Sequence, residues 1–241
     1  MKTNPKKYLL LITIFLFTFK NMKADEKKFE FGFSLFPNYS MVKISGGNAV
    51  HPNFNNDLES LSNGKLSLSF NLFSEYHIKK NSFIGLGLGY MNNGYRTEKT
   101  AFFAIDPMHG FISNDPNLPT HGRFVYNYHH IEIPLYYKHK FGKRFFAIVG
   151  ASSTFNIANK TRSIQYYVDG SIKKDDNNDN STNFRTFNIY GNIGFGVDYL
   201  QKENYSLFIM PYYQYGIMGV SKSTPVNRNF MSLGVSTGFR F

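Results

Sequence analysis

The sequence predicts an all-β protein, an eight-stranded antiparallel up-and-down transmembrane β-barrel with three or four long extracellular loops. One observation is the stretch from Phe230 to Phe241, in which large apolar side chains alternate with small or polar ones at the period of a β-strand. A second is that this alternation recurs along most of the chain upstream. A third is that long and short connections follow each other in turn, as they do in outer-membrane barrels. Together these observations place apolar side chains toward lipid and polar side chains toward the lumen.

The first residues have the features of a secretory signal peptide, which we expect over residues 1–24. Lysines precede an apolar run over residues 8–19, and Ala24 is a small residue at a suitable cleavage position. The run is too short to span a bilayer as a helix, which needs about 20 residues. An uncleaved membrane anchor is the alternative interpretation. Cleavage would leave a single barrel domain over residues 25–241.

Composition narrows the function classes. The chain has no cysteine, which excludes disulfides, thiolate metal sites and a cysteine nucleophile. Its 241 residues contain no Pro/Gly/Ser-rich linker, so one domain is expected. The net charge falls from +11 to +6 when the five lysines of residues 1–24 are removed. This modest charge, without a basic stripe that carries interleaved aromatic residues, argues against nucleic-acid binding.

Alternating residues define the strands, and turn-forming residues separate them. In the first strand Phe29, Phe31 and Phe33 alternate with polar or small residues, whereas in the fifth strand Phe145 and Phe146 obscure which face is apolar. The expected strands cover residues 29–39, 65–79, 84–90, 124–139, 144–157, 187–199, 207–213 and 230–241. Long loops are expected over residues 43–64, 93–122, 158–183 and 221–227, and tight turns over residues 79–81, 141–143 and 201–204.

The third strand contains glycines at a spacing of two residues, Gly85, Gly87 and Gly89. A dinucleotide-binding fingerprint needs Gly-x-Gly-x-x-Gly at the start of a helix, and no helix signal follows here. We therefore interpret these glycines as inner-face positions that leave room for large side chains, because an eight-stranded barrel is filled by its own side chains.

Two further local signals concern the third long loop and the prolines. Asp169 and Gly170 lie between two strand-like runs, which predicts a hairpin in which strands five and six continue beyond the membrane as a ribbon. Pro134 and Pro211 fall inside predicted strands, where each removes a hydrogen-bond donor from the ladder. We expect a β-bulge at each of these prolines.

Residues 128–141, YHHIEIPLYYKHKF, resemble a segment of the PorT-like, or porin-family, outer-membrane β-barrels. The Ile-Glu-Ile-Pro-Leu core at residues 131–135 is the most specific match, and the strand rhythm and the terminal Phe241 extend the similarity. The resemblance implies a small OmpA/OmpX-like barrel in the outer membrane of a Gram-negative-type cell. Some members of the family serve protein secretion. By similarity, Phe239 and Phe241 would form the C-terminal aromatic signal that the outer-membrane assembly machinery reads.

Six charged residues fall on the inward phase of their strands, and they include both signs. They are Glu30, Lys65, Glu132, Lys138, Asp198 and Arg240. Because an unpaired buried charge is very costly, we expect these residues to form a lumenal network of salt bridges and hydrogen bonds. This network would be structural, and the alternative is that it gates a narrow conduit.

The sequence predicts neither a catalytic site nor a metal or cofactor site. His129 and His130 precede Glu132, but neighbouring strand residues point to opposite faces, so the two imidazoles would not converge on one metal ion. Asp175 and Asn177 imitate the start of a calcium loop, but Thr186 stands where that loop needs a bidentate Glu.

We therefore expect a noncatalytic integral outer-membrane barrel with a structural or accessory role in protein secretion or surface interaction. Its expected partners are outer-membrane lipid, the assembly machinery and secretion-system proteins, and it is expected to be a monomer without cofactors. The alternatives are a lipid-modifying outer-membrane enzyme of the eight-stranded type, a narrow passive pore, and a soluble periplasmic ligand-binding barrel. The last of these requires the apolar side chains to point inward.

Overall fold

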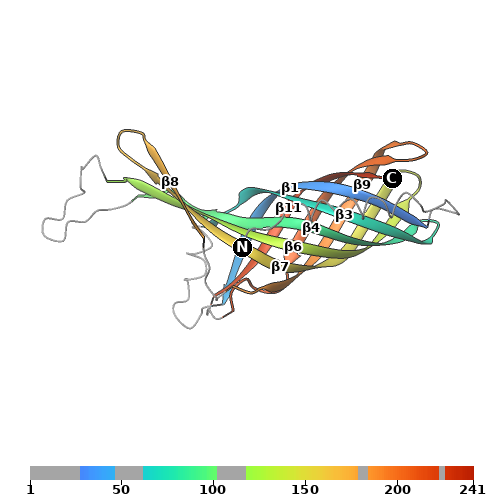
Figure 1. Ribbon diagram of the computed structural model, residues 1–241, viewed down its shortest axis with the longest axis horizontal. Coiled ribbons are helices and arrows are strands. Elements are labelled where there is room, and N and C mark those ends of the chain that lie inside the picture. The colour runs from blue at the N-terminus through green and yellow to red at the C-terminus, as the bar shows by residue number, and fades with distance from the viewer. Residues whose placement is uncertain (1–27, 47–61, 102–117, 179–183, 223–225) are drawn as a thin grey trace, which may run out of the picture.

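The computed structural model describes residues 28–46, 62–101, 118–178, 184–222 and 226–241 (Figure 1). These residues contain no helix long and apolar enough to cross a bilayer. The expected signal peptide, residues 1–24, lies outside the described residues, as do parts of all four expected long loops.

Eight long strands form the wall of a closed antiparallel barrel, which confirms the predicted fold class. They are β1 (Phe29–Gly46), β3 (Lys65–Lys79), β4 (Ser82–Thr97), β6 (His121–Phe141), β7 (Phe145–Tyr166), β9 (Phe187–Gln201), β10 (Ser206–Gly216) and β11 (Val226–Arg240). Each pairs with the next in this order, and β11 returns to β1, so the ring has no free edge. Three short strands lie outside this ring: β2 (Ser62–Asn63), β5 (Thr100–Ala101) and β8 (Ile172–Asn178).

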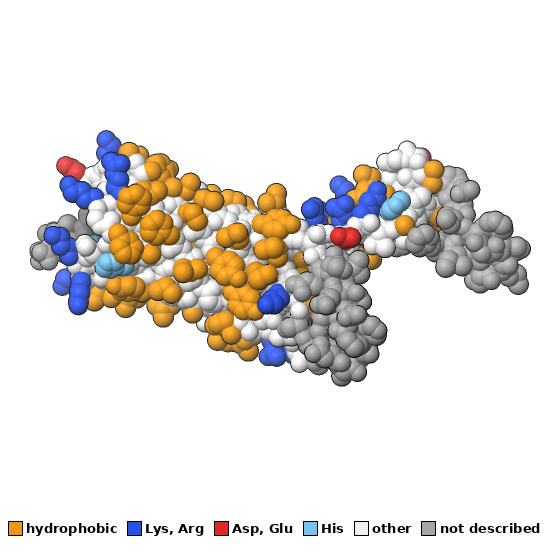
Figure 2. All heavy atoms as spheres, turned by 180° about the vertical axis from the view of Figure 1, so that it is seen from behind, with side chains coloured by type: hydrophobic (Ala, Val, Ile, Leu, Met, Phe, Trp, Pro, Cys, Tyr) orange, Lys and Arg blue, Asp and Glu red, His pale blue; other side chains and the backbone are white. Residues whose placement is uncertain are grey.

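The apolar side chains point outward, as predicted. Leu66 is 84% exposed, and Leu86, Ile193 and Leu233 are 54–57% exposed. Figure 2 shows hydrophobic side chains spread over the barrel wall, with Lys and Arg side chains gathered toward its ends. This arrangement is the opposite of a soluble ligand-binding barrel. Even the shortest wall strand, β10 with 11 residues, rises about 28 Å at the usual rise and tilt, enough to cross an apolar band of about 25 Å.

The tight turns lie at one end of the barrel, together with both chain ends of the wall. Gly142 has a φ of 71°, a left-handed conformation that favours glycine, in the turn between β6 and β7. A second left-handed glycine, Gly170 with a φ of 81°, follows Asp169 at the tip of the β7–β8 hairpin. The Asp-Gly signal for a hairpin is therefore confirmed.

The ribbon beyond the barrel differs from the prediction in its partners. Strand β7 continues to Tyr166, as expected, but its returning partner is the separate strand β8, and β6 accompanies it on the other side from His121. Strand β9 starts only at Phe187 and pairs with β7 inside the barrel. The ribbon thus has three strands, β6, β7 and β8, and Figure 1 shows it projecting from the long-loop end.

The expected bulges at the prolines are wrong. The β4–β6 pairing skips Pro134, and the β9–β10 pairing skips Pro211, but in both cases the register is the same before and after the gap. Pro37 leaves a similar gap between β1 and β11. A strand can thus omit the rungs that a proline cannot make without inserting a residue, because neighbouring rungs hold the register.

Inner-face glycines lie opposite large side chains, as predicted. In four cross-strand pairs a Cβ built on the glycine would lie less than 3 Å from the aromatic ring of its partner. The pairs are Gly32–Phe73, Gly85–Tyr136, Gly196–Phe146 and Gly238–Phe208. Phe146 is therefore an inner residue. The outer face of this strand, which the sequence left open, contains Phe145 and Val149.

We predict that Gly85→Val destabilises the barrel by about 1–3 kcal/mol, because overpacking a filled interior forces shifts in its neighbours. A Cβ at position 85 would lie 2.2 Å from the ring of Tyr136, whose hydroxyl donates a hydrogen bond to Glu75. The measurement is the urea midpoint of unfolding in detergent micelles. The control is Gly191→Val, because nothing lies within 4 Å of an added Cβ there; equal losses in the two variants would contradict the prediction.

Candidate functional site

The lumen is packed in layers from the short-turn end to the long-loop end. A charged cluster comes first and is followed by a layer of apolar side chains, which contains Phe73, Phe146 and Phe208 with Met210. Polar side chains around Glu132 occupy the middle of the barrel. A second apolar cluster fills the region toward the long loops, with members Val42, Ile44, Met91, Tyr95, Tyr128, Tyr190, Val220 and Phe230.

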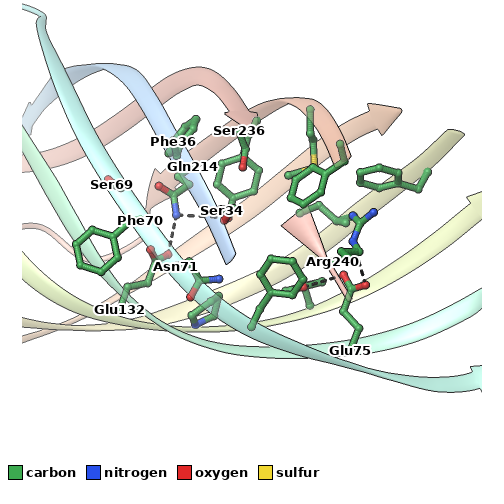
Figure 3. Close-up of a pocket in the computed structure, with 18 residues that line it drawn as sticks. Ser34, Phe36, Ser69, Phe70, Asn71, Glu75, Glu132, Gln214, Ser236 and Arg240 are labelled. Carbon is green, nitrogen blue, oxygen red and sulfur yellow. Dashed lines mark hydrogen bonds and ion pairs between the residues drawn. The ribbon is translucent and has the colours of Figure 1, made fainter. Parts of the chain in front are cut away.

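Glu75 is the centre of the charged cluster. It is 1% exposed, and its carboxylate accepts hydrogen bonds from the Lys138 ammonium and, at 2.9 Å, from the Tyr136 hydroxyl. Arg240 places its Nε 3.4 Å from the same carboxylate and donates through Nη1 to Asp198. Figure 3 shows the side chains of Arg240 and Glu75 pointing toward each other. One carboxylate thus ties β3 to β6 and to the closing strand β11.

Three further groups surround this centre. Lys138 also lies 3.7 Å from Glu30, which is 2.9 Å from the imidazole of His77. Lys140 lies 3.6 Å from Asp198. The cluster therefore contains three carboxylates and three cations: Glu30, Glu75 and Asp198, with Lys138, Lys140 and Arg240. This balance meets the requirement that charges in a poorly hydrated interior be compensated.

Aromatic rings contact the cations of the charged cluster. The Arg240 guanidinium lies 4.1 Å from the ring centroid of Phe208 and 4.5 Å from that of Phe146. The Lys138 ammonium lies 4.0 Å from the centroid of Phe83. These cation–π contacts add to the ion pairs and hold the long side chains in place. The ion pairs of the cluster link side chains of β1, β3, β6, β9 and β11.

The six residues predicted to line the lumen divide into three groups. Glu30, Lys138, Asp198 and Arg240 lie in the charged cluster. Glu132 lies in the middle of the lumen beside Gln214, and Lys65 lies at the start of β3, where it contacts Ser67 and Asn92. Glu75, Lys140 and His77 were not predicted. Continuing the alternation of the second strand past residue 72 would have identified Glu75 as an inner residue.

Glu132 lies in the middle of the lumen without a cation partner in the described part of the chain. It is 5% exposed and accepts a hydrogen bond of 2.7 Å from Gln214 Nε2. Figure 3 shows the two side chains together at one end of a small cavity, with Asn71 beside them. The cavity has a volume of about 60 Å³, which is room for a few water molecules at about 10–15 Å³ each.

The two adjacent histidines point to opposite faces. His130 is 4% exposed and lies in the lumen. His129 lies on the outer face, where its Nδ1 is within hydrogen-bond distance of the Tyr90 hydroxyl and, at 3.2 Å, of the Asn92 side-chain nitrogen. Over the residues that the structure describes, no group of three or more His, Cys, Asp or Glu side chains could hold a metal ion.

A serine–histidine contact lies at the short-turn end. Ser82 Oγ is 3.3 Å from His139 Nδ1 and 2.9 Å from the Tyr137 hydroxyl. A hydrolytic triad needs an acid on the second imidazole nitrogen, and within the described ranges His139 has no carboxylate among its hydrogen-bond partners. The sequence alone did not identify this pair, because its two members come from different strands.

The two C-terminal aromatic residues lie at the barrel seam. The Phe241 backbone exchanges hydrogen bonds of 3.1 and 2.8 Å with Phe31. The Phe239 ring stacks on Phe33 and Tyr205, at centroid distances of 6.0 and 5.4 Å. Both residues thus extend the pairing of β11 with β1 to the last position of the chain.

We predict that Glu75→Gln destabilises the barrel by about 3–5 kcal/mol, because it leaves Lys138 and Arg240 buried without the carboxylate that they share. Glu132→Gln is the matched control: this carboxyl neutralises no cation within the described ranges, and its loss should change stability by about 1 kcal/mol or less. Urea unfolding in detergent micelles measures both. A larger effect of Glu132→Gln than of Glu75→Gln would overturn the assignment of Glu75 as the centre of the cluster.

A search of the curated proteins gives no match. Among solved structures, the chain is similar to Neisserial surface protein A, with 14% identity, a TM-score of 0.40, and coverage of 88% of this chain and 96% of that chain. It is similar to Ail, the attachment invasion locus protein of Yersinia pestis, in complex with the heparin analogue sucrose octasulfate, with 12% identity, a TM-score of 0.39 and coverage of 89% and 99%. It is also similar to the outer membrane protease OmpT from Escherichia coli, with 9% identity, a TM-score of 0.42 and coverage of 92% and 99%.

The family comparison covers most of the chain. The model of the outer membrane protein beta-barrel domain matches residues 19–222. Together with the closed ring of strands and its apolar outer wall, this match shows that the chain belongs to the family of outer membrane protein beta-barrel domains.

Proposed function

We propose that this protein is a noncatalytic outer-membrane barrel whose working surface is the ribbon of β6, β7 and β8 outside the membrane. The barrel anchors this ribbon, and the ribbon contacts another protein. In view of the resemblance to PorT-like barrels, a component of a protein-secretion system is the first partner to test.

The observation that carries the proposal is the contrast between the lumen and the ribbon. The charged cluster and two apolar layers occupy the lumen, and the cavity that runs from Glu75 to Glu132 is small. Passage of a solute would require these layers to move apart. On this proposal the barrel conducts nothing and acts through the surface that it presents outside the membrane.

The ribbon extends beyond the closed part of the barrel. The pairing of β7 with β9 stops at Phe155, whereas its pairing with β6 and β8 extends to Tyr166. Strand β8 pairs only with β7 in the described part of the chain. Two apolar residues near the ribbon tip are exposed, Val168 to 65% and Ile172 to 52%. They offer a contact patch outside the lipid.

The free edge of β8 is suited to selective contact. Lys173, Lys174, Asp175 and Asp176 follow one another along it. Charged side chains on an edge strand oppose indiscriminate pairing with other chains. A partner would therefore have to match the charges of β8 as well as its apolar tip.

We predict that a photo-crosslinking amino acid at position 168 captures another protein in intact cells. The same residue at position 68 on the outer wall should capture only lipid, because Leu68 is exposed on the face that contacts hydrocarbon. Crosslinked bands are identified by mass spectrometry. Replacement of residues 161–177 by an Asn-Gly turn should abolish protein capture by a probe at position 159 while leaving the heat-dependent gel shift of a folded barrel intact.

Other outcomes would contradict the proposal. Stable single-channel conductance in planar bilayers would point to a pore. A lipid profile that changes on deletion of the protein and is restored only with intact Ser82 and His139 would point to a lipid-modifying enzyme. Capture of lipid alone at position 168 would remove the evidence for a protein partner.

The ribbon also contains an ion pair whose titration can be measured. Arg162 donates two hydrogen bonds to Asp176, of 2.6 and 2.9 Å, and this holds the pKa of Asp176 below its usual value. Because the pKa is lowered by folding, the pair supports the ribbon above pH of about 3.9, and the support is lost as the pH falls through the folded pKa.

We predict that Arg162→Gln raises the pKa of Asp176 toward the value of a free side chain, because the two hydrogen bonds that lower it are lost. The measurement is a carboxyl-carbon NMR titration of the protein in micelles. Lys173→Gln is the control, because Lys173 lies near Asp175 rather than Asp176. An Asp176 pKa that is ordinary in the unmodified protein would show that the ribbon pair does not form.

A further inference from the structure

The barrel wall has a window between β3 and β4 at the long-loop end. The β3–β4 pairing begins at Phe70↔Tyr90 and runs toward the short turns. On the other side, β2 pairs with β4 at Asn63↔Arg96, with the register changed by one residue. Between these two points residues 64–69 and 91–95 face each other without ladder pairs. We call this interval the β3–β4 window.

Side chains rather than backbone groups bridge the window. The backbone N–H of Asn92 donates to Ser69 Oγ of β3 at 3.3 Å, whereas that of Gly94 reaches past β3 and donates to Ser40 Oγ of β1 at 2.9 Å. The Lys65 ammonium donates to the side-chain oxygen of Asn92 at 2.8 Å. The window is thus a polar interruption in a wall that is otherwise apolar on its outer face.

Lys65 is a buried cation without a compensating anion in the described part of the chain. It is 8% exposed, and its hydrogen bonds, both of 2.8 Å, go to the neutral oxygens of Ser67 and Asn92. An ammonium has three N–H donors, so one donor is left after these two bonds. A buried charge is costly unless an opposite charge meets it.

An open groove of about 560 Å³ leads along the outer wall to Lys65. Leu66 and Leu68 line its apolar part, and Asn92 and Asn127 line its polar part. The lining of the groove therefore matches an amphiphile, because it is apolar along the wall and polar at the window.

Further cations lie next to the groove on the same face. Asn127 pairs with Lys160, and Arg96 and Arg162 occupy the next row of the same face, one on each side of Val125. Figure 2 shows Lys and Arg side chains gathered where the ribbon leaves the barrel. The nearby acids are Asp176, which forms an ion pair with Arg162, and Glu98, whose carboxylate is 3.4 Å from the side-chain nitrogen of Asn63. Cations outnumber acids on this face.

We propose that the groove at the β3–β4 window binds a lipid of the outer leaflet through an anionic phosphate in its head group. Lys65 donates its remaining N–H to the phosphate, and Lys160 and Arg96 provide the positive field around it. The acyl chains lie against Leu66 and Leu68. A lipid fits better than a soluble anion because the groove is open to hydrocarbon along its apolar side, and a charge-assisted hydrogen bond is strongest away from water. This site is independent of the proposed role of the ribbon tip.

The test is native mass spectrometry of the purified full-length protein with three probes: dioleoyl phosphatidylglycerol, dioleoylglycerol and glycerol 3-phosphate. We expect phosphatidylglycerol to bind most tightly, because it alone combines acyl chains with a phosphate. Lys65→Met and Lys160→Gln should each weaken its binding, by about tenfold for the loss of one charge-assisted contact at Lys65 and by less at Lys160.

The matched control is Lys173→Gln, on the opposite face of the ribbon, which should leave lipid binding unchanged. The heat-dependent gel shift checks that Lys65→Met is folded, and Lys160→Gln together with Arg96→Gln carries the test if it is not. Equal binding of phosphatidylglycerol and dioleoylglycerol, or no effect of these substitutions, would overturn the proposal. Glycerol 3-phosphate binding as tightly as phosphatidylglycerol would show a site for soluble anions instead.

Discussion

The rest of this structure depends on one constraint: inside a bilayer, every backbone N–H and C=O group needs a partner within the protein. Pairing of β11 with β1 meets this need by removing both sheet edges, and Phe241 carries the pairing to the last residue. Closure by eight strands then fixes a narrow interior. The number of strands therefore limits the volume of the side chains that can fill the lumen.

The narrow interior explains why glycines and large aromatic residues occupy facing positions on the inner side of the wall. Glycines lie opposite aromatic rings on neighbouring strands, so that each ring occupies the space that a second side chain would need. The aromatic layer in turn shields the charged cluster around Glu75, where three anions meet three cations. The side chains of Lys138 and Arg240 can remain charged here because each makes an ion pair with a carboxylate and a cation–π contact with an aromatic ring.

The alternation of residues was sufficient to predict the barrel, because the inner and outer faces of a strand follow from a period of two. It also placed Glu30 and Arg240 on the inner face, although which charges meet depends on register between strands far apart in the sequence. Asp169 and Gly170 predicted a turn but not the partners of the ribbon. The effect of Pro134 was misjudged, since nothing local tells whether a strand omits a rung or inserts a residue. The β3–β4 window could not be predicted for the same reason.

The prolines have a mechanical consequence. Pro37 and Pro211 lie on either side of Val235 in the closing strand: β11 misses rungs to β1 at Pro37, and β10 misses rungs to β9 at Pro211. Hydrogen bonds between strands carry circumferential tension in a barrel. At the level of Val235 the β11–β1 seam and the β9–β10 seam both lack rungs, one on each side of the intact β10–β11 seam. At this level the β10–β11 pair is therefore joined to its two outer neighbours by fewer hydrogen bonds than join β10 to β11, and a sideways pull here would separate the pair from the rest of the wall before separating β10 from β11.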